Sequence, residues 1–290
     1  MNKETTVKHI VERLRTAEID YHGRSGSGRY AGEDVKQIEA GVLIPIFFRV
    51  DQFTGADKFV FLLSKRSASV PQSGDLSGLG GKLEPFVDRF LRFFIVHGFP
   101  PLLGGEALMY AREREKVVFD RIALFLANAV RESWEEARLS PFNIRFLGPL
   151  PPYPLKLFTK TIFPIMGLVE KRWKFHSSPE VDKMTAIPLE TFYNTDNYNF
   201  FSIRYPDYTT DGMETERRFP CLTHTNTKGE EEILWGATFD IILSFLDIVF
   251  DFTPPEIQPD KIITRTLHPD YLTGNFKRRF KLLDKFRKDR

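Results

Sequence analysis

Three glutamates lie at helical spacing near the middle of this 290-residue chain. They belong to the run Arg131-Glu132-Ser133-Trp134-Glu135-Glu136. Apolar residues recur every three to five positions before it, from Val118 onward, which predicts a helix. At about 100° per residue, Glu132, Glu135 and Glu136 occupy one arc of roughly 100°. Carboxylates crowded in this way repel one another, and a hard cation such as Mg²⁺ or Mn²⁺ relieves the repulsion through oxygen ligands. The alternative is an acidic helix face in solvent.

The residues around the glutamates add to the metal hypothesis. Arg131 is predicted to orient one carboxylate through a charge-assisted hydrogen bond. Trp134 points away from the acidic arc, and we expect it to anchor the helix in the core. Upstream lies the glycine-rich run Gly78-Leu79-Gly80-Gly81-Lys82-Leu83-Glu84-Pro85. Its backbone at Gly80 and Gly81 is free to approach phosphates closely.

The glycine run and the glutamate helix together resemble the two halves of the Nudix box. The pattern of that family is G-x5-E-x7-R-E-U-x-E-E-x-G-U, where U is aliphatic. The resemblance implies an α+β fold, a Nudix-type α/β/α sandwich with a mixed β-sheet. It also implies a metal-dependent hydrolase that cleaves a diphosphate bond, with Mg²⁺ or Mn²⁺ as the cofactor.

Several later runs resemble the Nudix branch that cleaves coenzyme A and its thioesters. Each run is short, but their shared order along the chain is specific. They are Leu62-Leu63-Ser64-Lys65-Arg66-Ser67, Leu147-Gly148-Pro149-Leu150-Pro151-Pro152-Tyr153, Pro179-Glu180-Val181, Ile187-Pro188-Leu189 and Trp235-Gly236-Ala237-Thr238.

The resemblance assigns a role to each site residue. It implies metal ligands at Glu132, Glu135, Glu136 and the backbone of Gly80. It implies catalytic roles for Glu132, Arg131 and Glu180, with Glu180 as the general base and Glu170 as the second candidate. The substrate-binding residues that it implies are Arg66, Gly80, Gly81 and Lys82.

The chain departs from the family pattern in four places. Between Gly81 and Arg131 there are 36 residues more than the box allows, so an insertion splits the box. Counted back from the arginine, the box glutamate falls on Ala123, and the glycine that ends the helix is replaced by Arg138. Val70 stands where the coenzyme A branch has an arginine, which weakens that substrate assignment. The carboxylates proposed to replace the lost glutamate are Glu106, Glu113, Glu115 and Asp120.

The chain is expected to form one main domain with additions. We expect an N-terminal helix and loop at 1–40, a Nudix domain at 41–252 with a helical insertion at 86–123, and a C-terminal extension at 253–290. Periodicity predicts helices at 7–17, 87–96, 118–136 and 237–250, and strands at 41–48, 58–63, 144–147 and 161–169. Loops are predicted at 21–32 and 73–81.

Composition limits the partners and the compartment. Residues 276–290 carry eight Lys/Arg and two Asp, a charge of +6, so the rest of a chain with total charge +2 carries −4. A basic surface for nucleic acid is therefore not expected, although the tail forms a basic amphipathic pattern. The single Cys221, the charged N-terminus and the lack of a long apolar run favour a cytoplasmic protein without membrane insertion.

The insertion is rich in phenylalanine, and such a face is too apolar for solvent. It is expected either to pack on its own domain and shape the substrate pocket, or to form a homodimer interface. The leading hypothesis is hydrolysis of a coenzyme A-like or other small nucleoside-diphosphate-linked substrate. The alternatives are ADP-ribose or a dinucleotide as substrate, or a catalytically impaired Nudix-fold binding or regulatory protein.

Overall fold

The computed structural model describes residues 2–21, 28–30, 33–35, 38–50, 57–155, 160–206, 214–226, 228–266 and 271. The basic amphipathic pattern at 276–286 lies outside the described residues, as does most of the predicted loop at 21–32. In the described part of the chain, each helix is too short or too polar to cross a membrane. The helices are α1 (Lys3–Thr16), α2 (Pro85–Val96), α3 (Glu106–Arg112), α4 (Lys116–Ala137), α5 (Glu190–Tyr193) and α6 (Gly236–Phe250).

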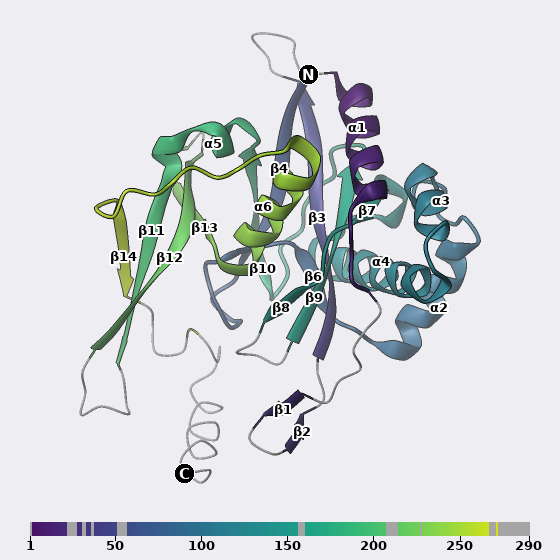
Figure 1. Ribbon diagram of the computed structural model, residues 1–290, viewed down its shortest axis with the longest axis horizontal. Coiled ribbons are helices and arrows are strands. Elements are labelled where there is room, and N and C mark those ends of the chain that lie inside the picture. The colour runs from purple at the N-terminus through teal and green to yellow at the C-terminus, as the bar shows by residue number, and fades with distance from the viewer. Residues whose placement is uncertain are drawn as a thin grey trace.

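A mixed sheet forms the centre of the molecule (Figure 1). Its main path runs β10-β4-β3-β9-β7, with β3 parallel to β9 and antiparallel to β4. The short strands β5, β6 and β8 pair with β4, β3 and β9. The α+β class and the mixed sheet are thus as predicted. The strands are β3 (Ile38–Val50), β4 (Asp57–Arg66), β5 (Leu76–Ser77), β6 (Leu79–Lys82), β7 (Ile144–Pro149), β8 (Tyr153–Leu155), β9 (Lys160–Val169) and β10 (Val181–Pro188).

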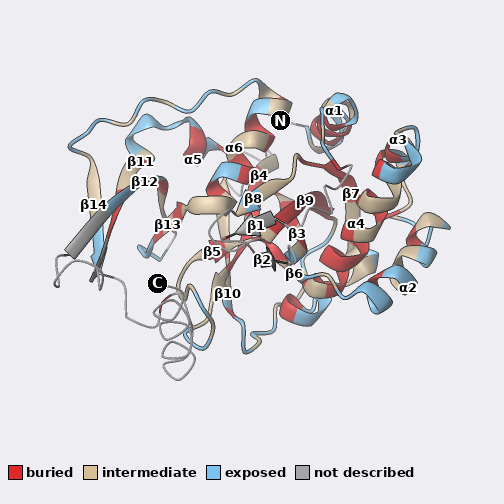
Figure 2. Cartoon of the chain, turned by 60° about the horizontal axis from the view of Figure 1, so that its bottom comes forward, coloured by how far each residue is buried: buried red, intermediate tan, exposed pale blue. Residues whose placement is uncertain are grey.

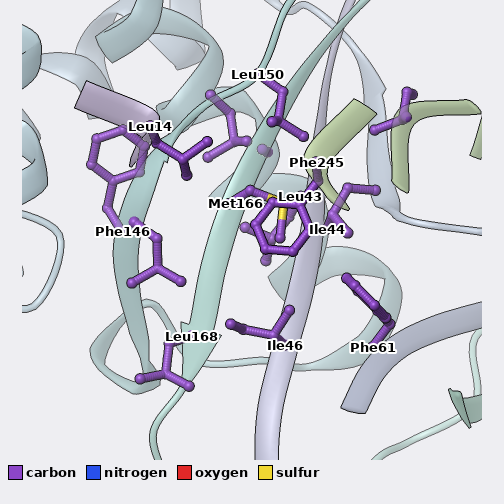
Figure 3. Close-up of a cluster of buried hydrophobic side chains, with 14 of the residues drawn as sticks. Leu14, Leu43, Ile44, Ile46, Phe61, Phe146, Leu150, Met166, Leu168 and Phe245 are labelled. Carbon is purple, nitrogen blue, oxygen red and sulfur yellow. The ribbon is translucent and has the colours of Figure 1, made fainter. Parts of the chain in front are cut away.

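Helices cover both faces of this sheet, which explains why its central strands are apolar on both sides. On one face, Phe163 of β9 stacks on Phe125 of α4, with ring centroids 3.8 Å apart. On the other face, Phe61 of β4 meets Phe245 of α6 edge to face at 5.8 Å. Figure 3 shows part of this second layer, where Leu14 of α1 joins the same cluster of buried side chains. The predicted sandwich is therefore present.

A second sheet lies beside the sandwich and was not predicted. Its order is β13-β12-β11-β14, and it packs against α6 through β12 and β13 (Figure 1). Strand β14 runs parallel to β11, so part of the expected extension at 253–290 is built into the same sheet as residues from the expected main domain. The strands are β11 (Tyr198–Pro206), β12 (Glu214–Thr225), β13 (Glu231–Trp235) and β14 (Ile262–Thr266). A separate small hairpin consists of β1 (Gly28–Tyr30) and β2 (Glu33–Val35).

The glycine-rich segment differs from its predicted form. Residues 73–81 were expected to be a loop, but β6 pairs antiparallel with β3, bringing Gly80 opposite Val42 and Gly81 opposite Gly41. Side chains at these positions would clash, because a Cβ on Gly80 would lie 2.3 Å from the carbonyl oxygen of Gly41. The glycines therefore serve close strand pairing as well as access to the site.

The inserted segment forms α2 and α3, and α2 packs along α4. Because α4 begins at Lys116, the expected end of the insertion at 123 falls inside this helix. Figure 2 shows α2 at the rim of the molecule, with much of its surface exposed. The same helix α4 thus carries the insertion's last residues at its start and the glutamates at its end.

Candidate functional site

The strand β6 and the end of helix α4 bring the glycines and the glutamates together. The backbone N–H of Gly80 donates a hydrogen bond to Oε2 of Glu136 at 3.2 Å. A Cβ on Gly81 would lie 2.5 Å from the carboxyl carbon of Glu132, so only glycine leaves room for that carboxylate. Two of the three predicted carboxylates therefore lie directly against the glycine strand.

Asn128 holds the strands against the helix. Its Oδ1 accepts a hydrogen bond from the backbone N–H of Gly41 at 2.6 Å, and its Nδ2 donates to the carbonyl of Lys82 at 3.3 Å. A Cβ on Gly41 would lie 2.6 Å from the carbonyl oxygen of Phe125. The close approach of β3 and α4 therefore depends on a glycine and a fully buried amide.

Arg131 contacts most of the acidic side chains at the site. It is 8% exposed, and its guanidinium contacts three carboxylates. Nε donates to Oδ1 of Asp88 at 2.8 Å, Nη1 donates to Oε2 of Glu135 at 2.9 Å, and Nη2 lies 3.0 Å from Oε1 of Glu132. The predicted orienting role of Arg131 fits these contacts, and the arginine reaches two glutamates of the helix.

Asp88 on α2 was not anticipated as a site residue. It is fully buried, and its Oδ2 accepts hydrogen bonds from Asn128 Nδ2 at 3.1 Å and from the backbone N–H of Glu84 at 2.7 Å. Counting forward from Gly81 gives the box glutamate at Val87, one residue before Asp88. Counting back eight residues from Arg131 stays on α4 and reaches Ala123, because the insertion separates the glycine half of the box from the arginine half.

Three of the four acidic residues first considered as replacements have partners elsewhere. Glu106 accepts a hydrogen bond from the Tyr110 hydroxyl, Glu113 pairs with Arg15, and Asp120 pairs with Arg92. The carboxylate that meets the box arginine is thus supplied by the first helix of the insertion.

Burial and mutual repulsion disfavour the charged forms of the two inner glutamates. Glu136 is 9% exposed, and burial, together with the charges of Glu132 and Glu180, raises its pKa to about 8 against the lowering effect of the Gly80 N–H and Arg66. Burial also raises the pKa of Glu132, which the guanidinium of Arg131 partly offsets. A cation bound between them would lower the pKa of both carboxylates and favour their charged forms.

The oxygen atoms at the site are of the type that binds a hard divalent cation. Glu132 and Glu136 offer carboxylate oxygens beside backbone atoms of the glycine strand, which suits Mg²⁺ or Mn²⁺. Glu135 is hydrogen-bonded to Arg131, and its side chain is 52% exposed. Within the described ranges, no three acidic, histidine or cysteine side chains form a closed cluster around one point. The carboxylates of Glu132 and Glu136 thus both lie against the glycine strand, whereas that of Glu135 is hydrogen-bonded to Arg131.

Comparison with known proteins shows a partial sequence similarity to one curated protein. No family model matches the sequence. Over 118 residues, the chain is 26% identical to the protein named "Uncharacterized Nudix hydrolase NudL" of Pectobacterium atrosepticum. The chain is thus similar in part of its length to a protein named as a Nudix hydrolase. The matched stretch is 40% of this chain and spans 55% of the length of that relative.

Solved Nudix structures resemble the chain at low identity. An Ap4A hydrolase from C. elegans, in a binary complex, is 16% identical with a TM-score of 0.32; the match covers 53% of this chain and 81% of that one. A MutT/nudix family protein from Enterococcus faecalis is 11% identical with a TM-score of 0.37, covering 87% of this chain and 75% of that one.

Helix α4 ends in the conformation that the Nudix pattern assigns to glycine. Arg138, at the C-cap, has φ 53° and ψ 30°, the left-handed region in which a non-glycine residue is strained. Its guanidinium lies over the ring of Trp134, 5.5 Å from the centroid. Trp134 is 45% exposed, so the prediction that it anchors the helix in the core was wrong. The core contacts of α4 come from its opposite side, at Phe125 and Ala129.

Two cations act electrostatically on these carboxylates, from β4 and β9, the strands on either side of β3. The charge of Arg66, at the end of β4, lowers the pKa of Glu136, and its Nε donates to the carbonyl of Pro71 at 2.8 Å. Lys160, at the start of β9, was not predicted as a site residue. Burial and the charge of Arg66 lower its pKa, whereas Glu132 and Glu136 raise it. The side chain of Lys82 is exposed, and its carbonyl accepts from Arg131 at 3.3 Å.

The two candidate bases occupy different places. Glu180 precedes β10 and is exposed, and its charge raises the pKa of both Glu132 and Glu136, so it lies within electrostatic range of the two carboxylates. Glu170 lies at the end of β9, where it pairs with Lys3 at 2.8 Å and with Arg145 at 2.5 Å. Of the two, only Glu180 is electrostatically coupled to the glutamate helix.

Proposed function

We propose that this protein is a metal-dependent diphosphatase that acts on small nucleoside-diphosphate-linked substrates. The observation that carries the proposal is the placement of Glu132 and Glu136 against the Gly80-Gly81 strand, with Arg131 held behind them. The sequence relative supports the family, and the chemistry follows from the charges at this site. The proposed catalytic unit lies within the proposed Nudix domain at 41–252, which includes the helical insertion at 86–123.

Each residue has a defined part in the proposed reaction. Glu132 and Glu136 would hold Mg²⁺ or Mn²⁺, and Glu135 would join them on release from Arg131; the Gly80 backbone lies close enough to Glu136 to share the ion's surroundings. When bound, the metal supplies charge neutralisation for the phosphates and a more acidic water. Glu180 would accept the proton from the attacking water.

Basic residues would bind the remaining phosphate charge. Arg66 and Lys160 both act electrostatically on Glu136, so a diphosphate beside that glutamate would lie within reach of their fields. Lys82 is exposed at the end of the glycine strand and would contact the substrate at the mouth of the site. Gly81, whose Cβ side is filled by the Glu132 carboxylate, would contact a phosphate through its backbone.

A cavity next to Arg66 is our candidate for the rest of the substrate. It has a volume of about 200 Å³ and lies between β4 and the second sheet, lined by Lys65, Asp75, Glu232, Trp235 and Arg265 among others. The backbone N–H of Arg66 donates to the carbonyl of Asp75 at 2.9 Å, so the cavity adjoins the strand end that carries the arginine. Its carboxylates and aromatic rings suit the amino groups and faces of a nucleobase. Trp235→Leu should therefore raise KM more than it lowers kcat.

The deciding experiment compares hydrolysis by the wild type and by Glu136→Gln, with Mg²⁺ and with Mn²⁺. The substrate panel is coenzyme A, ADP-ribose and a dinucleoside polyphosphate, with products identified by mass. Losing even an indirect metal partner costs about 10–100-fold, so we expect Glu136→Gln to lose at least about 100-fold in kcat. The metal should also raise the melting temperature of the wild type and not that of the variant. Equal activity in the two proteins would refute the role of Glu136.

The panel also separates the alternatives. Release of phosphopantetheine from coenzyme A would support the coenzyme A branch, whereas cleavage of ADP-ribose alone would exclude it for this chain. A binding or regulatory role is the second candidate, favoured by the contact that keeps Glu135 on Arg131. It predicts ligand-dependent stabilisation without turnover of any compound in the panel.

A further inference from the structure

Helix α2 has a narrow buried side and a wide aromatic outer side. Asp88 and Ile95 are its buried residues, and they point toward the domain. The outward-facing rings are far more exposed than those of core phenylalanines: Phe86 is 88%, Phe90 61% and Phe93 56% exposed. Buried phenylalanines of the core, by contrast, are exposed by a few per cent or less. This side of α2 is therefore unpartnered within the described chain.

The exposed rings form one continuous surface that extends beyond α2. Phe94 contacts Phe90, Phe93 and Phe99 edge to face, and Phe99 contacts Phe142 with centroids 5.3 Å apart. We call this surface the phenylalanine face; it consists of Phe86, Phe90, Phe93, Phe94, Phe99 and Phe142. Because five of the six rings, all but Phe86, already pack against one another, these five have little side-chain freedom to lose when a partner covers them.

The size of the phenylalanine face matches one side of a stable protein interface. A phenylalanine has on the order of 200 Å² of surface that can be buried, so the exposed fractions of the six residues amount to about 700 Å². The largest apolar patch on a typical monomer is about 300–600 Å², and each partner in a standard interface contributes about 800 Å².

We propose that the phenylalanine face is the surface on which a second copy of this chain docks. A two-fold interface brings the same patch of both copies together, and an apolar aromatic patch is complementary to itself without any charge pairing. Of the two arginines of α2, Arg92 pairs with Asp120, and Arg112 of α3 donates to the carbonyl of Val96, so within the described chain Arg89 is the one arginine of α2 left for a lipid headgroup. An anionic lipid surface would instead require uncompensated cations around the rings.

The interface would also act on the site through α2. The inner side of this helix carries Asp88, whose carboxylate binds Arg131 behind the glutamates. Covering the outer side with a second copy would fix α2 against α4 and thereby hold that ion pair. The insertion would then have two roles, supplying the missing carboxylate and securing it by dimerisation.

Sedimentation velocity and light scattering test the proposal from submicromolar to tens of micromolar protein, without reference to activity. The wild type should have twice the chain mass of 33.7 kDa. Phe90→Asp and Phe93→Asp should each raise the dimer dissociation constant at least about 100-fold, because a two-fold interface loses two buried rings and gains two buried charges. Tyr193→Asp is the matched control, since Tyr193 on α5 is 52% exposed and outside the face. It should remain dimeric.

Three outcomes would overturn the proposal. They are a wild type that stays monomeric at every concentration, a dimer that survives both phenylalanine substitutions, and a dimer that Tyr193→Asp disrupts equally. Co-sedimentation of a monomeric wild type with phosphatidylcholine and phosphatidylserine vesicles, abolished by Phe90→Asp, would assign the face to a lipid surface instead. Circular dichroism on each variant checks that loss of the dimer is not loss of folding.

Discussion

Asp88 offers the sharpest test of how the site is held together, through the substitution Asp88→Asn. The change keeps the shape of the side chain but removes its charge and turns one acceptor into a donor. Both oxygens are in use: Oδ1 accepts from Arg131 at 2.8 Å, and Oδ2 accepts from Asn128 at 3.1 Å and from Glu84 N at 2.7 Å. Whichever way the amide turns, a donor will face a donor.

Removing one partner of a buried ion pair costs about 3–5 kcal/mol. Arg131 retains Glu132 at 3.0 Å and Glu135 at 2.9 Å, so we expect the lower end, about 3 kcal/mol in the free energy of unfolding. For a chain of this size the melting temperature should fall by roughly 6–9 °C. Since Arg131 orients Glu132, kcat should fall by about 10–100-fold.

A matched control lies on the same two helices. Asp120 of α4 pairs with Arg92 of α2 at 2.5 Å, but its side chain is 42% exposed, so Asp120→Asn should cost less than about 1 kcal/mol. Differential scanning calorimetry and steady-state kinetics on both variants make the comparison. Asp88→Glu restores the charge and should recover part of the activity. Equal melting temperatures for Asp88→Asn and Asp120→Asn would refute the role of Asp88 in holding Arg131.

Three further predictions concern the glycine strand, the buried lysine and the helix end. Gly81→Ala should abolish activity in a folded protein because its Cβ would occupy the position of the Glu132 carboxylate; Gly105→Ala, with its nearest atom 3.8 Å away, should be silent in the same assay. Lys160→Met should raise KM for diphosphate substrates with a smaller effect on kcat, and an unchanged KM would remove this lysine from the site. Arg138→Gly should raise the free energy of unfolding by about 1 kcal/mol, measured by urea denaturation, because glycine adopts the left-handed cap without strain; a loss of stability would show that the guanidinium matters more than the backbone.

Local patterns determined much of the fold in advance. The periodicity of apolar residues predicted α1, α6 and the helical position of the glutamates, and apolar runs predicted the central strands β3, β4, β7 and β9 within a few residues. These elements could be predicted because each depends on which of its side chains face the core, and the order of apolar and polar residues within the segment shows this. The second sheet was not predicted, since the parallel pairing of β11 with β14 joins segments more than fifty residues apart in the chain.

The sequence by itself determined which residues are chemically equipped for the site: the glutamates on one helix face, Arg131 beside them and two adjacent glycines upstream. Only the tertiary structure decided which of them meet. It placed Glu132 and Glu136 against the glycine strand, turned Glu135 toward Arg131, and supplied Asp88 from the insertion. The physical reason is that spacing along a helix determines only which side of the helix a side chain lies on. The partner of a buried charge depends on how separate helices and strands pack, and counting residues in the sequence does not show this.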